Sequence, residues 1–306
     1  MTSNPANRLH PSLQFLILVS ITVGIVLVGN LIGAGIVAAF YGLDMVFNIV
    51  QLDFSDPHTV NALWILQILG TTIPLLIVPL VFAQFIVKQR QEYLKPSFNF
   101  PWPVIVIVFC VMMVSSPLIE LLSRINQDMV LPDYLNGVQK WMRDSEDKAE
   151  KLITVLLKMD TVFGAIANVI AIGLFTAIVE ELMFRGCVQT IFVKWTGNVH
   201  AAVWITAILF SAFHMEFFGF LPRLLLGALF GYFAAWSGSV WPAVWGHFLN
   251  NATAVVAVYL YQHKLVKIDP NSTHIFKYPA YVFSFIIVLF LLFLYHNVAK
   301  KQATAS

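Results

Sequence analysis

The sequence contains few charged residues and almost no cysteine. Of its 306 residues only 11% are charged and 59% are hydrophobic, whereas soluble proteins carry about 25% charged residues. This shortage of charge excludes an ordinary soluble protein and predicts an integral membrane protein surrounded by lipid. The net charge of +2 is spread along the chain without a basic stripe, so no nucleic-acid partner is expected.

The chain also lacks the features of a disulfide-stapled or multidomain protein. Its two cysteines, Cys110 and Cys187, lie in apolar runs, where they are expected to pack as small apolar side chains. The first apolar run is too long for a signal-peptide core and has no convincing cleavage site, so we expect it to be retained as a membrane helix. Because no repeat or low-complexity segment is present, residues 1–306 are expected to form a single integral-membrane domain.

Long apolar runs dominate what is present. A membrane-spanning helix needs about 20 mostly apolar residues, and eight runs approach this length, with breaks such as Asp56-Pro57 between them. The sequence therefore predicts an all-α fold, a polytopic bundle of about eight transmembrane helices. In the first run Gly29 and Gly33 are four residues apart, which predicts close packing against another helix. The predicted helices lie near residues 13–41, 60–87, 102–122, 161–183, 199–216, 218–236, 241–262 and 279–298.

The longest polar stretch, about residues 126–158, mixes charges of both signs with apolar residues at helical spacing. Val138, Trp141 and Met142 lie among these charges. This pattern predicts an amphipathic connector at the membrane interface. Two roles stay open for it, a gate for substrate entry and a plain solvated connection.

The charges that flank the runs predict the orientation of the chain. Arg8 precedes the first run, Lys88 and Arg90 follow the second, and Lys300 and Lys301 follow the last. Because cytoplasmic loops carry an excess of basic residues, an even number of spans with both termini cytoplasmic is expected. The compact size and short termini favour a bacterial inner (plasma) membrane.

Three polar clusters interrupt the apolar runs, and each ionised group at membrane depth costs about 2–4 kcal/mol, so such residues are functional candidates. The first cluster contains Glu180, Glu181 and Arg185. On a helix Glu181 and Arg185 share a face and are able to pair, while Glu180 points elsewhere and is left for proton transfer. The alternative is a charge cluster at a helix end.

The other two clusters contain imidazoles. Phe210 and His214 are four residues apart, as are His247 and Asn251. A carboxamide beside an imidazole is suited to donate hydrogen bonds to an oxyanion; Asn250 is a weaker competitor for that role. The alternative for these residues is interhelical packing and hydrogen bonding.

Taken together, Glu-Glu-x-x-x-Arg, Phe-x-x-x-His and His-x-x-x-Asn on successive helices resemble the three motifs of the CPBP family. That family includes the type II CAAX prenyl proteases and the bacterial abortive-infection (Abi) membrane proteins. The resemblance covers about residues 161–255, and all three motifs are complete.

The resemblance implies a glutamate-dependent intramembrane endopeptidase on an eight-helix fold. By position, Glu180 and His214 correspond to the pair that activates a water molecule, and His247 and Asn251 to the pair that stabilises the oxyanion. The residues that would support the site are Glu181 and Arg185.

A zinc-dependent version of the same protease is an alternative, with Glu180, His214 and His247 as ligands. The chain lacks the His-Glu-x-x-His pattern, in which one helix supplies two ligands and the base. We therefore expect no cofactor and no metal.

Two functions from other classes compete with proteolysis. A proton-coupled transporter also uses Glu, His and Arg within the membrane, but no inverted repeat is visible. A non-catalytic scaffold or immunity protein would keep the fold without the reaction. For a protease, the expected substrate is a membrane-associated peptide or protein, which is CAAX-like in the family that the motifs resemble.

Overall fold

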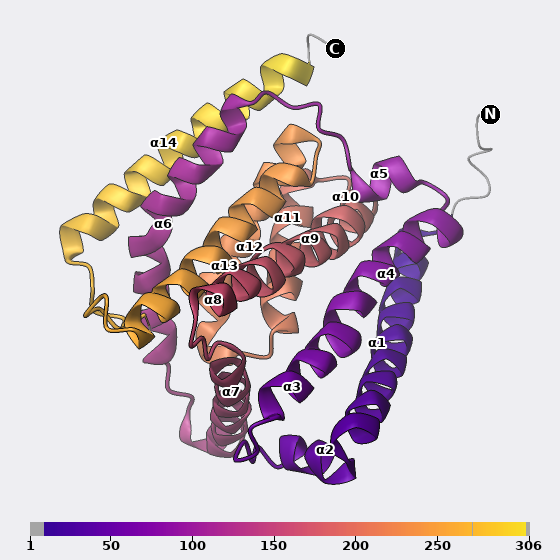
Figure 1. The fold of residues 1–306 in the computed structure, drawn as a ribbon. Coiled ribbons are helices and arrows are strands. Elements are labelled where there is room, and N and C mark those ends of the chain that lie inside the picture. Colours follow the sequence, from indigo (N-terminus) through magenta and orange to yellow (C-terminus); the bar gives the residue numbers. More distant parts are fainter. Residues whose placement is uncertain (1–8, 271, 304–306) are drawn as a thin grey trace.

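The computed structural model describes residues 9–270 and 272–303, and it is a bundle of helices, as the sequence predicts. Eight helical segments run up and down through the bundle in alternation (Figure 1). They are α1 (Pro11–Tyr41), α3–η2–α4–η3 (Thr59–Ile86), α6 (Pro103–Gln127), α8–η5–α9–η6–α10 (Val162–Thr196), α11 (Val199–Phe213), α12 (Phe220–Ser237), α13 (Trp241–Gln262) and α14 (Tyr278–Ala303). The elements outside these eight segments are α2 (Leu43–Val50), α5 (Arg90–Leu94), η4 (Asp133–Leu135), α7 (Asn136–Leu156) and η7 (Phe217–Gly219).

Six helices of the described chain are long and apolar enough to cross a membrane. Of the other two predicted spans, α11 is apolar but has only 15 residues, and α13 has 22 residues but includes polar side chains. The six are Pro11–Tyr41, Thr59–Ile86, Pro103–Gln127, Val162–Thr196, Phe217–Ser237 and Tyr278–Lys300.

The fourth span differs from the prediction, because it does not end near residue 183. It continues to Thr196 and ends at Gly197, whose φ of +65° suits a residue without a side chain. Arg185, which is expected to mark the end of the apolar helix, is instead fully buried against Glu181. The ionised residues therefore lie inside this helix rather than at its end.

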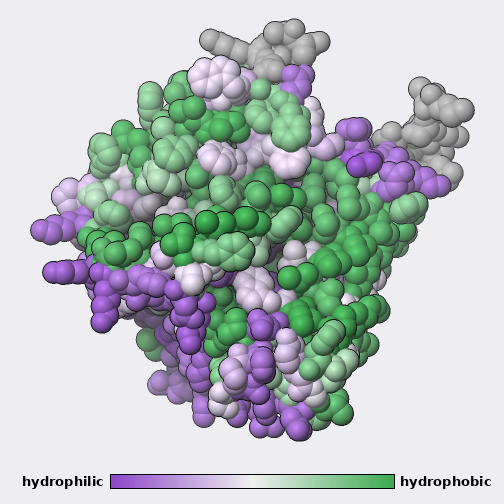
Figure 2. Space-filling model, in the orientation of Figure 1, coloured by the Kyte–Doolittle hydropathy of each residue, from purple (hydrophilic) through white to green (hydrophobic). Residues whose placement is uncertain are grey.

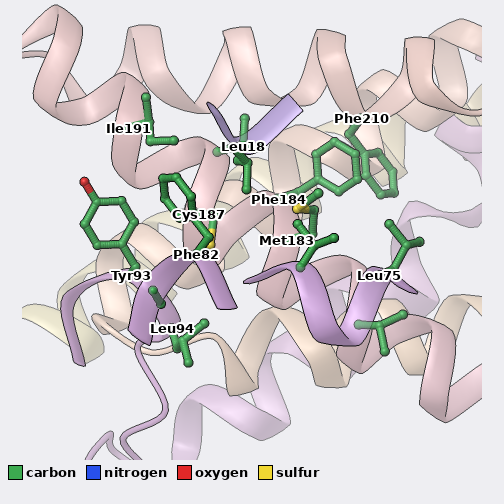
Figure 3. Packing of buried hydrophobic residues seen from close by; sticks show 14 residues of the cluster. Leu18, Leu75, Phe82, Tyr93, Leu94, Met183, Phe184, Cys187, Ile191 and Phe210 are labelled. Carbon is green, nitrogen blue, oxygen red and sulfur yellow. The ribbon is translucent and has the colours of Figure 1, made fainter. Parts of the chain in front are cut away.

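A hydrophobic cluster attaches the first half of the chain to the second half, as Figure 3 shows. Leu18 of α1, Leu75 of the second span and Tyr93 of α5 are buried against residues of η6 and α10. Phe184 from η6 packs edge-on against Phe210 of α11, with ring centres 5.2 Å apart. The cluster thus fixes the span that carries Glu180 and Glu181 against its neighbours.

The glycine face predicted on α1 is a real close contact. A Cβ atom on Gly29 would lie 2.3 Å from the carbonyl oxygen of Leu69, and one on Gly33 would lie 3.3 Å from a Leu66 methyl group. The two helices therefore approach each other at distances that a side chain at position 29 would prevent.

The polar connector forms α7, which lies at the end of the bundle opposite the two chain ends (Figure 1). Hydrophilic side chains gather at this end of the face seen in Figure 2, and apolar side chains cover much of its middle. Trp141 of α7 packs on Phe217 with ring centres 5.1 Å apart. The start of α1 and the end of α14 lie at the same end of the bundle, as an even number of spans requires; Arg8 and the side chain of Lys301 lie outside the described residues.

Candidate active site

Two π-helical segments flank the helix turn that carries the paired glutamates. Glu180 and Glu181 end α9 (Thr176–Glu181), which lies between η5 (Val169–Phe175) and η6 (Leu182–Val188). Such widened turns occur often at functional sites because they change the direction of the side chains that follow. Here they place both carboxylates inside the bundle, with Glu181 fully buried and Glu180 only 8% exposed.

Glu181 and Arg185 form the predicted ion pair. Arg185 Nη1 donates to Glu181 Oε1 at 3.1 Å, and both side chains are completely buried. The other side of the guanidinium donates from Nη2 to the carbonyl oxygen of Gly227 on α12 at 2.9 Å. Its carbon also lies 4.5 Å from the centre of the Phe210 ring. Arg185 therefore joins three helices while neutralising a carboxylate.

Glu180 has different surroundings from Glu181. Among the described residues its Oε2 atom has no hydrogen-bond partner; Glu181 Oε2 also has none, but Glu181 is bound through its Oε1 atom. Two imidazole nitrogens face Glu180 Oε2, His214 Nε2 and His247 Nε2, each at 3.9 Å. This distance is too long for a direct hydrogen bond and suits a water molecule that bonds to both groups. The structure therefore brings together side chains from three predicted motifs.

The hydrogen bonds of the two imidazoles fix which nitrogen faces Glu180. His214 Nδ1 lies 2.8 Å from the carbonyl oxygen of Phe210, and because a carbonyl only accepts, Nδ1 carries the proton. His247 Nδ1 lies 2.9 Å from Glu181 Oε1 and donates to that carboxylate. In both rings Nε2 is the nitrogen available for chemistry.

The cluster brings two carboxylates, Glu180 and Glu181, together with one guanidinium, Arg185. His247 lies between the two glutamates, with Nδ1 2.9 Å from Glu181 Oε1 and Nε2 3.9 Å from Glu180 Oε2.

Asn251 lies one helical turn beyond His247 on α13, at the edge of this cluster. Its Nδ2 donates to the carbonyl oxygen of Ile172 in η5 at 3.2 Å, and its Oδ1 accepts from Asn250 at 3.2 Å. The carboxamide therefore contacts the π-helical segment rather than the glutamates. One of its two N–H groups stays available to another acceptor.

Two residues that support the site carry no recognisable signal in the sequence. Phe230 of α12 stacks on the His247 ring, with centres 5.0 Å apart and planes 15° from parallel. Gly227 supplies the carbonyl that Arg185 binds, and a Cβ atom there would lie 3.1 Å from Ala207 Cα. Only the spacing of Gly227 and Gly231, four residues apart, hints at close packing of α12.

A metal ion would be held by Glu180, His214 and His247. The donors are of types that zinc prefers, but ligands of one tetrahedral zinc lie about 3.4 Å apart, and here Oε2 is 3.9 Å from each Nε2. In the described part of the chain no group of three or more His, Cys, Asp or Glu side chains is arranged to hold a metal ion.

An apolar cavity of about 500 Å³ lies beside the turn that follows His214. Phe217 of that turn lines it, together with Ile125 of α6, Met129 just after α6 and Met142 of α7. The amphipathic connector thus forms one wall of a hollow beside this turn.

Comparison with known proteins gives one match that covers this part of the chain. Residues 162–253, which include all three motifs, match the sequence model of a family described as Rce1-like, type II CAAX prenyl endopeptidase. The chain is also similar to the uncharacterized protein YpbD of Bacillus subtilis (strain 168), with 24% identity over 115 residues. That alignment covers 36% of this chain and 54% of the relative, so the chain spans about half the length of that protein. No solved structure matches the chain significantly.

Proposed function

We propose that this integral membrane protein, whose residues 162–253 match the Rce1-like family of type II CAAX prenyl endopeptidases, hydrolyses a peptide bond with water activated by Glu180 and His214. The observation that carries the proposal is the unpartnered Oε2 atom of Glu180, which faces two imidazole nitrogens at 3.9 Å. A buried carboxylate left without a partner costs free energy, and a site for a reacting water molecule explains why it is present.

The first half of the reaction uses Glu180 and His214. With Nδ1–H donated to the Phe210 carbonyl, His214 Nε2 has a free lone pair. Glu180 and this nitrogen bind one water molecule, take its proton as its oxygen attacks the peptide carbonyl, and pass that proton to the leaving amine. The products are a carboxylic acid and an amine, which ionise in water to a carboxylate and an ammonium group, and both residues return to their starting states.

The second element of the proposal is oxyanion stabilisation by His247 and Asn251. A protonated His247 donates from Nδ1 to Glu181 and has Nε2–H free for the developing oxyanion. The remaining N–H of Asn251 is a second donor. Such preorganised donors often contribute the largest part of catalysis in acyl transfer. Glu181 and Arg185 hold His247 in place and balance its charge.

We favour the metal-free form of this reaction. The Glu180 and histidine donors are more widely spaced than zinc ligands, and the two imidazoles already face a carboxylate that serves as the base. If zinc is bound, Glu180, His214 and His247 would have to move closer together and would hold it as a Lewis acid.

The proposed substrate is a membrane-associated peptide or protein, and a CAAX-like C-terminus is one candidate because the matching family acts on prenyl substrates by its description. The proposed location is a bacterial inner membrane, with both termini cytoplasmic. The apolar cavity beside the turn after His214 is wide enough to accept an apolar part of such a substrate.

The test is cleavage of a peptide library in liposomes by the wild type, Glu180→Gln and Glu120→Gln. Glu120 is the matched control, because it is also 8% exposed but accepts hydrogen bonds from Ile275 N, Phe276 N and Tyr281 Oη, which belong to none of the three motifs. We expect cleavage by the wild type and Glu120→Gln, loss in Glu180→Gln, and no effect of a strong chelator.

Other outcomes decide between the alternatives. Loss of cleavage on chelation, restored by zinc, would convert the proposal into a metalloprotease. Equal cleavage by Glu180→Gln and the wild type would remove Glu180 from the mechanism. Absence of cleavage by every variant would contradict the protease and favour a scaffold, or a transporter if pH-dependent flux is then observed.

A further inference from the structure

The turn between α11 and α12 carries His214, and α11 holds only part of it: the backbone N–H groups of His214 and Met215 donate to Ser211 O and Ala212 O, and Ser211 Oγ donates to Phe220 O. α11 ends at Phe213, and Met215 then adopts a φ of +54°, a left-handed conformation that residues other than glycine seldom adopt. The chain reverses through Glu216 and η7 (Phe217–Gly219) before α12 begins. Because His214 lies directly before this strained reversal, the place of its ring depends on the contacts that hold the turn as well as on the bond between its Nδ1 and Phe210 O in α11.

Asn126, near the end of α6, holds this turn with both ends of its carboxamide. Its Nδ2 donates to the carbonyl oxygen of Phe217 at 3.0 Å, and its Oδ1 accepts from the backbone N–H of Leu221 at 2.7 Å. These two backbone groups are four residues apart, the spacing of one helical bond. The Asn126 side chain, only 3% exposed, thus bridges two groups that a continuous helix would join directly.

A second helix holds the same turn from another side. Glu146 Oε2 of α7 accepts from the backbone N–H of Phe218 at 3.0 Å. The guanidinium carbon of Arg143 lies 3.3 Å from the centre of the Phe218 ring, which is 1% exposed. The turn is therefore fixed between α6 and α7, while the rest of the active site comes from α9, η6 and α13.

We propose that Asn126 is a positioning residue for His214, which clamps the α11–α12 turn so that His214 Nε2 lies 3.9 Å from Glu180. The inference rests on the proposed function, in which His214 acts on the attacking water. Asn126 lies outside the segment 162–253 that matches the family, so its contacts to the turn do not follow from that match. It does not touch the reacting atoms and acts only through the turn.

The test replaces Asn126 by leucine, which has a similar size but no hydrogen-bonding groups. Asn168→Leu is the matched control, because Asn168 is also a buried asparagine, 5% exposed, but bonds to Gly164 O within its own helix. Steady-state cleavage gives kcat and KM, and NMR of the protein labelled in its histidine rings reports on His214, assigned through His214→Ala.

We expect Asn126→Leu to lower kcat about 10- to 100-fold, the range for a small misplacement of a catalytic group, and to change KM less than about 3-fold. The His214 resonance should move while that of His247 stays. Asn168→Leu should leave kcat and both resonances near those of the wild type. If Asn126→Leu does not fold, Asn126→Asp keeps the acceptor for Leu221 and loses the donor to Phe217, and the same changes are expected at smaller size.

An unchanged kcat in a folded Asn126 variant, with the His214 resonance unmoved, would overturn the positioning role and leave the protease intact. A fall in kcat equal to that of Asn168→Leu, with no movement of the His214 resonance, would also overturn it. If the wild type cleaves nothing, the proposed function fails; the NMR readout still decides whether Asn126 positions His214.

Discussion

At the scale of single residues, two adjacent glutamates have opposite surroundings although the sequence makes them neighbours. Glu181 Oε1 lies within hydrogen-bond distance of Arg185 and His247. The Oε2 atoms of both glutamates have no partner among the described residues, but that of Glu180 faces two imidazole nitrogens at 3.9 Å. A rotation of about 100° per residue separates their side chains, so one carboxylate is bound to the scaffold and the other faces the imidazoles. Substitutions at the two positions should therefore fail in different ways.

We predict that Glu181→Gln lowers thermal stability much more than Glu180→Gln does. Removal of one partner from a buried ion pair leaves a charge without compensation and costs about 3–5 kcal/mol; Arg185, which is fully buried, would be that charge. Glu180→Gln removes a carboxylate whose Oε2 has no bond to lose. Melting temperatures in the same detergent measure the difference, and equal melting temperatures for the two variants would contradict these roles.

At the scale of helices, the sequence predicts where most spans begin but not how polar residues change their ends. The range 241–262 coincides with α13 (Trp241–Gln262). The span predicted to end at 183 continues to Thr196. A hydropathy profile counts Arg185 as a charged residue that ends an apolar run, and it does not include the ion pair with Glu181 that neutralises this charge. The π-helical segments have no signature in composition; in η5 the carbonyl oxygen of Ile172 accepts from Asn251 Nδ2 of α13, a contact between separate helices.

In the candidate active site, too, the sequence predicts contacts within one helix but not contacts between helices. Helical spacing predicts the pair Glu181–Arg185. It also puts Phe210 and His214 four residues apart, and their ring centres lie 4.9 Å from each other. It does not predict Phe230 on His247, or the clamp by Asn126, because those contacts join segments far apart in the chain. Packing decides which side chains of three separate helices come together. In a single sequence, motifs are the only indication of that convergence.

One prediction at this scale concerns the contact of α1 with the second span. Gly29→Ala would place a Cβ atom 2.3 Å from Leu69 O and 2.7 Å from Pro74 Cγ, and overpacking of this kind costs about 1–3 kcal/mol. Gly24→Ala on the same helix is the control, because nothing lies within 4 Å of a Cβ atom there. Thermal unfolding in detergent should show a lower melting temperature for Gly29→Ala but not for Gly24→Ala. An equal decrease in the melting temperature of Gly24→Ala would mean that helix propensity or lipid contact causes the effect.

The docking of α7 should depend on pH through Glu146. Burial raises the pKa of this carboxyl above its ordinary value, and the hydrogen bond from Phe218 N offsets only part of the shift. A folded pKa above the unfolded value of about 4.3 means that the neutral form is favoured by folding. The stability that Glu146 contributes is therefore complete below the unfolded pKa and is lost as pH rises through the folded pKa.

Limited proteolysis of α7 from pH 4.5 to 8 measures this dependence. The wild type should be cut faster as pH rises through the range just above the ordinary glutamate pKa. Glu146→Gln keeps an acceptor for Phe218 N without a charge and should remove that part of the dependence. An identical profile for both proteins would show that another group controls the docking.

At the scale of the whole molecule, the basic residues do not decide the orientation by themselves. Lys88, Arg90 and Lys300 lie near the end of the bundle that contains both chain ends. The opposite end also carries basic residues, on α7 and in the segment before α14, where acidic residues accompany them. Because the positive-inside rule counts basic residues whatever their acidic neighbours, the two ends compete, and the topology requires a direct measurement.

The topology is measured by labelling single cysteines. Each of Gln91→Cys, Asp144→Cys and Lys300→Cys is introduced separately into a Cys110→Ala, Cys187→Ala background. Gln91 precedes α6 and Asp144 follows it, so one span separates them, and α14 returns the chain to the end where Gln91 lies. With both termini cytoplasmic, a membrane-impermeant maleimide should label Asp144→Cys on intact cells and the other two only after permeabilisation. The reverse pattern would invert the orientation and keep the bundle. Labelling of positions 91 and 300 from opposite sides would contradict the even number of spans, and with it the arrangement that brings Glu180, His214 and His247 to one depth.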